Sequence, residues 1–368
     1  MKHKTLLMQM KTVSRTCCLS RNECCAQPMT NTRRKVVYKS FAKTMILIVL
    51  IALAAGCGPA GPTVTPAPPA VPTATPTPPT GTPVPPTATA AAPTPTPESS
   101  AQGFLLEGVG FETPESVLYD PEADVYLVAN IHGGPSAKDG NGFISRISPQ
   151  GEVIALKWID GAAESVPPFT LHAPKGMALT GDRLFVADID VVRVFDRETG
   201  EWLSEIPIRG AGFLNDVAAA EDGTVYVTDS RTGVIYRILP DGSLEQVGRL
   251  ENPNGIQTLG ETILVTGGTN QIFRLGDDGA WTPEYEAPAR GLDGLILLDD
   301  GRVLVSSWMG SAVYLFDADG QVTELFSGIN APADIGFDTK RNVVLIPHFE
   351  DDRVEARPLP SLLPGIGE

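Results

Sequence analysis

Cysteine is missing from most of this chain. Its five cysteines lie at positions 17, 18, 24, 25 and 57 of 368 residues. The part after Cys57 therefore has neither disulfides nor thiolate metal sites. Long apolar runs are missing too, since the longest, residues 45–55, has eleven residues. A run of that length is too short to be a comfortable membrane span.

Basic residues are scarce outside the N-terminal segment. Residues 1–56 carry ten Lys or Arg and one Glu, a net charge of +9, and the whole chain carries −16. The remaining residues therefore carry −25. A body this acidic argues against binding to nucleic acid and against adsorption on anionic lipid, and it is compatible with cation binding.

The N-terminal segment has the order of a secretory signal. Basic residues at 33–35, 39 and 43 precede the apolar run, and small residues lead to Cys57. Residues 54–57 (AAGC) resemble a bacterial lipobox, in which the Cys is lipidated and becomes the mature N-terminus. We therefore expect an extracytoplasmic, membrane-anchored bacterial lipoprotein. The alternative is an uncleaved short anchor.

Two further segments precede the main domain. Residues 1–28 come before Met29, and we interpret them as an over-extended start, removed with the signal at residues 1–56. Residues 57–102 hold the lipidated Cys57 and a stretch rich in Pro, Thr and Ala that has no charge before Glu98. This composition predicts a polyproline-II spacer between the membrane and a domain at 103–368.

That domain is built from a repeat, clearest at residues 213–248. Short runs of alternating apolar residues, such as TVYVTD and VIYRIL, are bounded by Asp-Gly and Pro-Asp-Gly turns, which is typical of an antiparallel four-stranded meander. Five related copies occur, and the set spans 113–153, 173–208, 213–248, 252–285, 291–328 and 331–359. A four-stranded unit of about 40 residues predicts an all-β fold, a six-bladed β-propeller of antiparallel blades. The last copy lacks a convincing outer strand, so residues 103–111 should supply it and close the ring.

A polar residue stands at the start of the first strand in each copy, where packing alone would favour an apolar one. These residues are Glu115, Lys175, Asn215, Asn254, Asp293 and Asp334. The first strand of each propeller blade lines the central channel, so the six should converge at one mouth. Two longer connections, at 132–141 and 160–172, should overhang one face.

Oxygen ligands dominate this set, because Glu115, Asn215, Asn254 and Asp293 offer two carboxylates and two amides without any Cys or aligned His. Such a set suits a hard divalent cation, Ca²⁺ first, with Zn²⁺, Mg²⁺ or Mn²⁺ as alternatives. The competing interpretation is that these side chains only bind water and cap strand ends. We include Lys175, Asp216, His132 and Asp334 as further residues of the pocket, and Trp308 as a residue of its wall.

The motifs PES at 114–116, FLND at 213–216, PNG at 253–255 and LDG at 292–294 resemble the senescence marker protein/gluconolactonase/luciferin-regenerating enzyme-like family. The resemblance covers about 265 residues. It implies one divalent ion in the channel, direct ligands at Glu115, Asn254 and Asp293, and Asn215 beside the metal and substrate. It also implies hydrolysis of sugar lactones and related esters with Asp293 as general base. The family's sugar-binding arginines have no clear counterpart here.

Two other functions remain open. The segment GTVYVTDSRTGVIYRI fits the NHL repeat equally well. That repeat would give a non-catalytic propeller that binds a ligand or partner protein through the same mouth. A strictosidine-synthase-like propeller is a third interpretation without a distinctive marker. For the leading one we expect a monomer, a small lactone or sugar-like substrate, and a membrane contact through the anchor at Cys57.

Overall fold

The turns that divide the repeat end its strands as the sequence predicts. In the computed structural model, which describes residues 103–165 and 167–360, Gly223 and Gly242 both have positive φ and close hairpins in the copy at 213–248. The four strands of that copy are β10 (Leu214–Ala219), β11 (Val225–Asp229), β12 (Val234–Ile238) and β13 (Leu244–Arg249). The predictions for the signal, Cys57 and the spacer lie outside the described residues.

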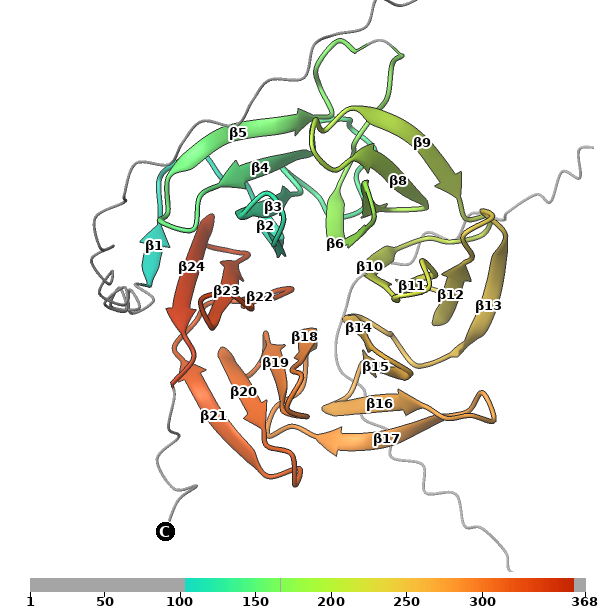
Figure 1. Ribbon diagram of the computed structural model, residues 1–368, viewed down its shortest axis with the longest axis vertical. Coiled ribbons are helices and arrows are strands. Elements are labelled where there is room, and N and C mark those ends of the chain that lie inside the picture. Colours follow the sequence, from blue (N-terminus) through green and yellow to red (C-terminus); the bar gives the residue numbers. More distant parts are fainter. Residues whose placement is uncertain (1–102, 166, 361–368) are drawn as a thin grey trace, which may run out of the picture. The chain divides into compact units, whose positions relative to one another are not determined.

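The described residues form six four-stranded antiparallel sheets, arranged as blades around a central channel (Figure 1). Blade three is β10 to β13. Blades one and two contain β2 (Pro114–Asp120), β3 (Val125–Asn130), β4 (Phe143–Ile147), β5 (Val153–Asp160), β6 (Pro174–Thr180), β7 (Arg183–Asp188), β8 (Val191–Asp196) and β9 (Trp202–Pro207). Blades four to six contain β14 (Ile256–Leu259), β15 (Thr262–Thr266), β16 (Gln271–Leu275), β17 (Trp281–Glu286), β18 (Leu292–Leu297), β19 (Val303–Ser307), β20 (Ala312–Phe316), β21 (Val322–Ser327), β22 (Gly336–Asp338), β23 (Val343–His348) and β24 (Arg353–Pro358). The predicted six-bladed propeller is confirmed.

The ring closes through the first strand of the domain. β1 (Phe104–Leu106) pairs with β24 as the outermost strand of the sixth blade, with Phe104 opposite Ala356 (Figure 1). The Phe104 ring also stacks on Tyr126 of blade one, with 6.2 Å between the ring centroids. The closing strand therefore joins the two ends of the domain, as the short sixth copy predicted.

The hydrophobic core lies between the blades, because each sheet is covered on both faces by its neighbours. Every interface between adjacent blades holds its own apolar cluster. The middle strands are accordingly apolar on both faces, and β3 and β19 are buried at every residue. The outer strands β9 and β13 face solvent and stay largely exposed. The described part of the chain contains no helix that is long and apolar enough to span a membrane.

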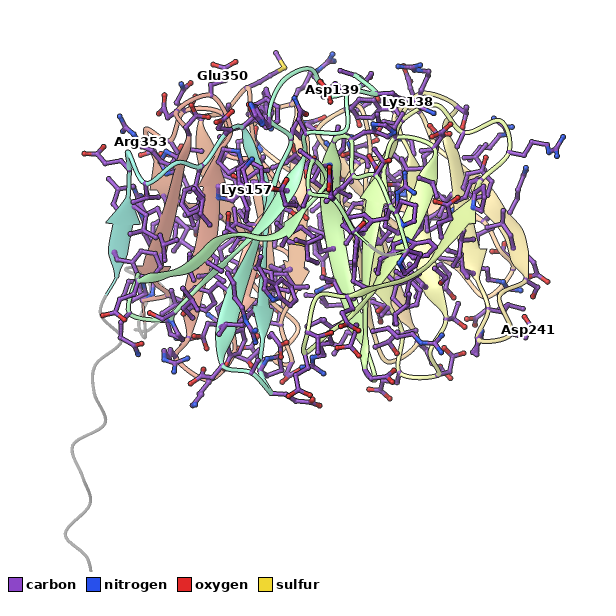
Figure 2. The ribbon with its side chains drawn as sticks, turned by 90° about the horizontal axis from the view of Figure 1, so that it is seen from above. Lys138, Asp139, Lys157, Asp241, Glu350 and Arg353 are labelled. Carbon is purple, nitrogen blue, oxygen red and sulfur yellow. The ribbon has the colours of Figure 1, made fainter. Side chains whose placement is uncertain are left out.

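Two loops stand on the same end of the ring as the polar strand starts of blades one to five. The connection from β3 to β4, which carries Lys138 and Asp139, lies at the opposite end from Asp241 (Figure 2). Gly142 N donates to Leu171 O, and Gly140 N donates to His172 Nδ1. The two connections are therefore hydrogen-bonded to each other, and the sequence predicted only that both overhang one face.

Candidate functional site

In blades one, two, three and five, β-bulges turn the polar residue at the start of the first strand into the channel. Strands β2, β6, β10 and β18 each shift register against their neighbour at the polar pair, for example between Leu214 and Val217 and between Leu292 and Leu295. A bulge leaves a residue unpaired and re-aims its side chain. Residues such as Asn215 and Asp293 therefore face the channel, although they belong to hydrogen-bonded strands.

Five of the six predicted positions line one cavity of about 410 Å³, which we call the mouth cavity. It lies at the end of the channel that carries the loop at 132–141. Its polar wall includes Glu115, Lys175, Asn215, Asn254 and Asp293, one from each of blades one to five. The predicted convergence therefore holds for these five residues.

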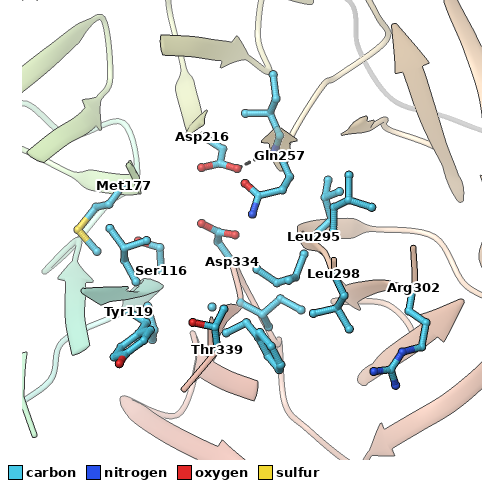
Figure 3. Close-up of a pocket in the computed structure, with 18 of the residues that line it drawn as sticks. Ser116, Tyr119, Met177, Asp216, Gln257, Leu295, Leu298, Arg302, Asp334 and Thr339 are labelled. Carbon is cyan, nitrogen blue, oxygen red and sulfur yellow. Dashed lines mark hydrogen bonds between the residues drawn. The ribbon is translucent and has the colours of Figure 1, made fainter. Parts of the chain in front are cut away.

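Asp334 lies elsewhere, in a second cavity of about 350 Å³ at the other end of the channel, which we call the opposite cavity. Figure 3 shows Asp334 and Asp216 there, with their carboxylates directed toward one another near Gln257. Both cavities belong to one channel, but Asp216 and Asp334 line only the opposite one.

The displacement of Asp334 reflects a shift of one residue in the sixth copy. In three blades, a hydroxyl on the second strand donates to the backbone carbonyl of the residue at the mouth position of the next blade. Thr228 donates to Asn254, Thr266 to Asp293 and Ser306 to Ala333. Ala333 is therefore the sixth mouth position, and Asp334 is equivalent to Asp216. Gly176 and Gly294 leave room for these two carboxylates, since an added Cβ would lie 1.9 Å from Asp216 Oδ1 or 2.1 Å from Asp334 Oδ1.

Two carboxylates in the mouth cavity have buried oxygens without a hydrogen-bond partner, namely Glu115 Oε2 and Asp293 Oδ1. Burial raises the pKa of Asp293 to about 7, and nearby polar groups of Trp308 and Asn254 oppose this rise without reaching good hydrogen-bond geometry. Burial also raises the pKa of Glu115 well above its ordinary value, and the Asp293 charge adds to the rise. An unpaired buried charge is costly, so the cavity favours a cation or a proton.

The two asparagines are held in one chain of hydrogen bonds. Asn215 Nδ2 donates to Asn254 Oδ1 at 2.6 Å and to Ser230 Oγ at 3.0 Å. Asn254 Nδ2 donates to the Leu292 carbonyl, and Ser230 Oγ donates to the Pro253 carbonyl. The amide positions are therefore fixed before any ligand arrives.

Among the described residues, Lys175 is the only cationic side chain in the wall of the mouth cavity. Its Nζ donates to the Ala173 carbonyl at 2.9 Å and lies 4.6 Å from the centre of the Phe213 ring. Burial lowers its pKa, and the charges of Glu115 and Asp188 oppose this effect. Within the described residues it forms no ion pair with Asp216 or Asp334, so its positive charge remains available to the mouth carboxylates.

Of the other residues near the site, some line the cavity and others have only structural contacts. His132 does not line the mouth cavity: its Nε2 lies 2.6 Å from Glu112 Oε2, and its Nδ1 lies 3.3 Å from the Asn141 carbonyl. Asp188 accepts backbone N–H groups of His172 and Ala173, which is a structural role. Trp308 does line the cavity. Sequence reasoning missed Met309 and Phe349, which lie in turns without a periodic pattern.

The donor set fits a divalent cation. Glu115 and Asp293 supply free carboxylate oxygens, and Asn254 adds an oriented amide oxygen. No three His, Cys, Asp or Glu side chains of residues 103–165 and 167–360 gather as a metal site would require. The set is therefore complete only with amide oxygen and water, which is a coordination that Ca²⁺ accepts readily.

No protein-family model matches the chain, and no curated protein matches it. Solved structures do resemble it. A gluconolactonase from Xanthomonas campestris has 22% identity and a TM-score of 0.55, over 71% of this chain and 91% of its own. A protein assigned as a gluconolactonase has 19% identity and a TM-score of 0.55, over 70% and 92%. Virginiamycin B lyase from Staphylococcus aureus has 14% identity and a TM-score of 0.51, over 69% and 98%. At these identities, the chain shares with them the propeller fold.

Proposed function

We propose that the propeller is a divalent-cation-dependent hydrolase of lactones or related esters, with the mouth cavity as its active site. The observation that carries this proposal is the pair of buried carboxylates, Glu115 and Asp293, whose oxygens without partners share one cavity with the fixed amides of Asn215 and Asn254. The fold shared with the gluconolactonase from Xanthomonas campestris is consistent with it.

Glu115, Asn254 and Asp293 would hold the cation, with Asn215 beside it. When bound, the cation would polarise the ester carbonyl and lower the pKa of a water molecule. Ca²⁺ is our first choice, because the donors are all oxygen, and Zn²⁺, Mg²⁺ and Mn²⁺ are the other candidates.

The chain's own groups would supply proton transfer and orientation. Asp293 has an oxygen free to accept the proton of the attacking water. The hydrogen-bonded Asn215 and Asn254 would place the substrate oxygen, and Lys175 would offset part of the negative charge. The narrow cavity, built on rigid strands, would keep these groups in register.

A lactone and aryl-ester panel, assayed with and without chelator, tests the proposal. We expect hydrolysis of at least one member to be lost on chelation and to return when Ca²⁺ or another of the four ions is added. Hydrolysis that is indifferent to chelation would contradict cation dependence. Tight binding without any turnover would instead favour the ligand-binding alternative.

We also propose that Cys57 carries a lipid that tethers the propeller outside the cytoplasm, supported by the basic and apolar segments that precede it. Several acyl chains on one Cys are enough for stable anchoring. In a bacterial host, we expect Cys57→Ser to move the protein from the membrane fraction to the soluble fraction. Retention of the variant in the membrane fraction would contradict the lipid anchor and favour an uncleaved apolar segment.

A further inference from the structure

The outer part of the mouth cavity is walled by apolar side chains. Trp308 and Phe349, from blades five and six, lie with their ring centroids 4.7 Å apart. Met309 follows Trp308 and is 75% exposed, the largest fraction among the exposed large apolar side chains of the described residues. Phe213 lies across the cavity, and Pro135 reaches it from the loop at 132–141. An exposed Met beside an aromatic pair is typical of a surface that takes up an apolar ligand.

Two side-chain contacts hold the loop that carries Pro135 in place at this rim. Lys138 Nζ lies 2.6 Å from Asp190 Oδ2 of blade two, and Arg231 Nη2 of blade three donates to Ser136 Oγ at 3.2 Å. These contacts place Pro135 on the cavity wall and add one more apolar side. Four blades therefore contribute apolar side chains to the rim.

The polar atoms of the wall are mostly engaged with each other. Asn215 and Asn254 are hydrogen-bonded together, Ser230 Oγ donates to the Pro253 carbonyl, and Lys175 Nζ donates to the Ala173 carbonyl. The buried polar atoms left without a partner are Glu115 Oε2, Asp293 Oδ1 and Trp308 Nε1. Free polar capacity is thus limited to the two carboxylates and the single indole N–H of Trp308.

A sugar lactone is poorly matched to this distribution. Each of its hydroxyl groups needs a hydrogen-bond partner once it leaves water, and an unmatched one is costly. The lining outside the five polar strand starts offers few polar groups, namely Asn252, Ser230 and the indole N–H of Trp308, and no Arg of the described residues lines the cavity. A substrate with a polar ring and an apolar substituent would match both the carboxylate end of the cavity and its apolar rim.

We propose, on the basis of the hydrolase function above, that the substrate is a lactone or ester with an alkyl or aryl substituent and without hydroxyl groups. The reacting carbonyl lies at the Glu115 and Asp293 end, and the substituent lies against Trp308, Met309 and Phe349. A cavity of about 410 Å³ is at the smaller end of the range for ligand pockets. The substituent is therefore short, comparable to a pentyl chain or a single aromatic ring.

The test compares δ-lactones that share one ring: δ-valerolactone, its alkyl derivatives up to δ-decalactone, and glucono-δ-lactone. We expect kcat/KM to rise about fourfold with each added methylene until the cavity is full. Glucono-δ-lactone should be the poorest substrate. Met309→Ser should flatten this rise, because it removes apolar rim from an exposed position that the fold does not need. Leu203→Ser, at an exposed apolar residue on the outer strand β9, is the matched control and should leave the rise unchanged.

Binding of the corresponding lactams, which resist hydrolysis, separates this inference from the hydrolase function. If no lactone is hydrolysed but the pentyl lactam binds more tightly than the polyhydroxylated lactam, the ligand class stands and the hydrolase fails. If glucono-δ-lactone is the best substrate, or its lactam the best ligand, the ligand class is overturned. If no member of the series is hydrolysed or bound, both proposals fail.

Discussion

Replacing Asp293 by Asn should stabilise the metal-free protein and abolish its hydrolytic activity. The carboxyl has a buried oxygen without a partner and a pKa raised to about 7 by burial, so its ionised form is poorly accommodated at pH 8. A neutral amide of the same shape avoids that cost, which is on the order of a few kcal/mol. The same change removes the proposed general base, and hydrolysis should fall about 10²- to 10⁴-fold. Denaturant unfolding in chelator and kcat/KM with cation measure the two effects.

Asp188→Asn is the matched control, because Asp188 is as deeply buried but fully partnered. Its carboxylate accepts the backbone N–H groups of His172 and Ala173 and an N–H of Arg193. The same substitution there should destabilise the fold, since it disrupts a satisfied network. A destabilising effect of Asp293→Asn in chelator would indicate that its carboxylate has a structural partner. Retained hydrolysis would remove Asp293 from the mechanism.

The metal-free protein should lose stability as the pH rises from about 4 to about 8. Burial raises the pKa of Asp216 and of Asp293 from the ordinary value of 3.8 to about 7, and it raises those of Glu115 and Asp334 as well. A carboxyl with a raised folded-state pKa holds its proton in the folded protein after the unfolded chain has lost it. Its contribution is therefore complete below pH 3.8 and is lost as the pH passes through about 7.

Surface carboxylates set the acid limit of this profile. Hydrogen bonds from Arg341 hold the pKa of Asp124 below its ordinary value, so its contribution is lost as the pH falls below about 4. Unfolding free energies at pH 5, 6, 7 and 8 in chelator should decline by several kcal/mol in total. Saturating cation should remove the part of this decline that comes from Glu115 and Asp293, because it binds their ionised carboxylates. A profile that rises toward pH 8 in chelator would contradict the raised pKa values.

The fold could be predicted from the sequence because each blade repeats the same local chemistry. Alternation such as TVYVTD and turns such as Asp222-Gly223 determine strands and hairpins over a few residues, and their period of about 40 residues determines the number of blades. The short last copy indicated closure by the N-terminal strand, which β1 provides. Local rules and global arrangement agree throughout this domain.

The site could be predicted only in part, because side-chain direction depends on single residues. The interval from Asp293 to Asp334 is 41 residues, against 39 for the two preceding intervals, and this small excess was the visible sign that Ala333 is the sixth mouth position. The bulges that turn polar residues into the channel in four of the blades leave no pattern in the sequence. The apolar rim at Met309 and Phe349 lies in turns, where neither alternation nor spacing identifies a pocket wall.

The assignment of a cation to the mouth cavity is tested most directly by calorimetric titration of Ca²⁺, Zn²⁺, Mg²⁺ and Mn²⁺ into the metal-free protein. We expect one ion per chain, with release of protons at pH 6 to 7, because the carboxyls at the site have raised pKa values and must ionise to bind it. Binding should be lost in the Glu115→Gln, Asp293→Asn double variant. If none of the four ions binds at millimolar concentration, or if binding survives in that variant, the cation site does not exist in the mouth cavity.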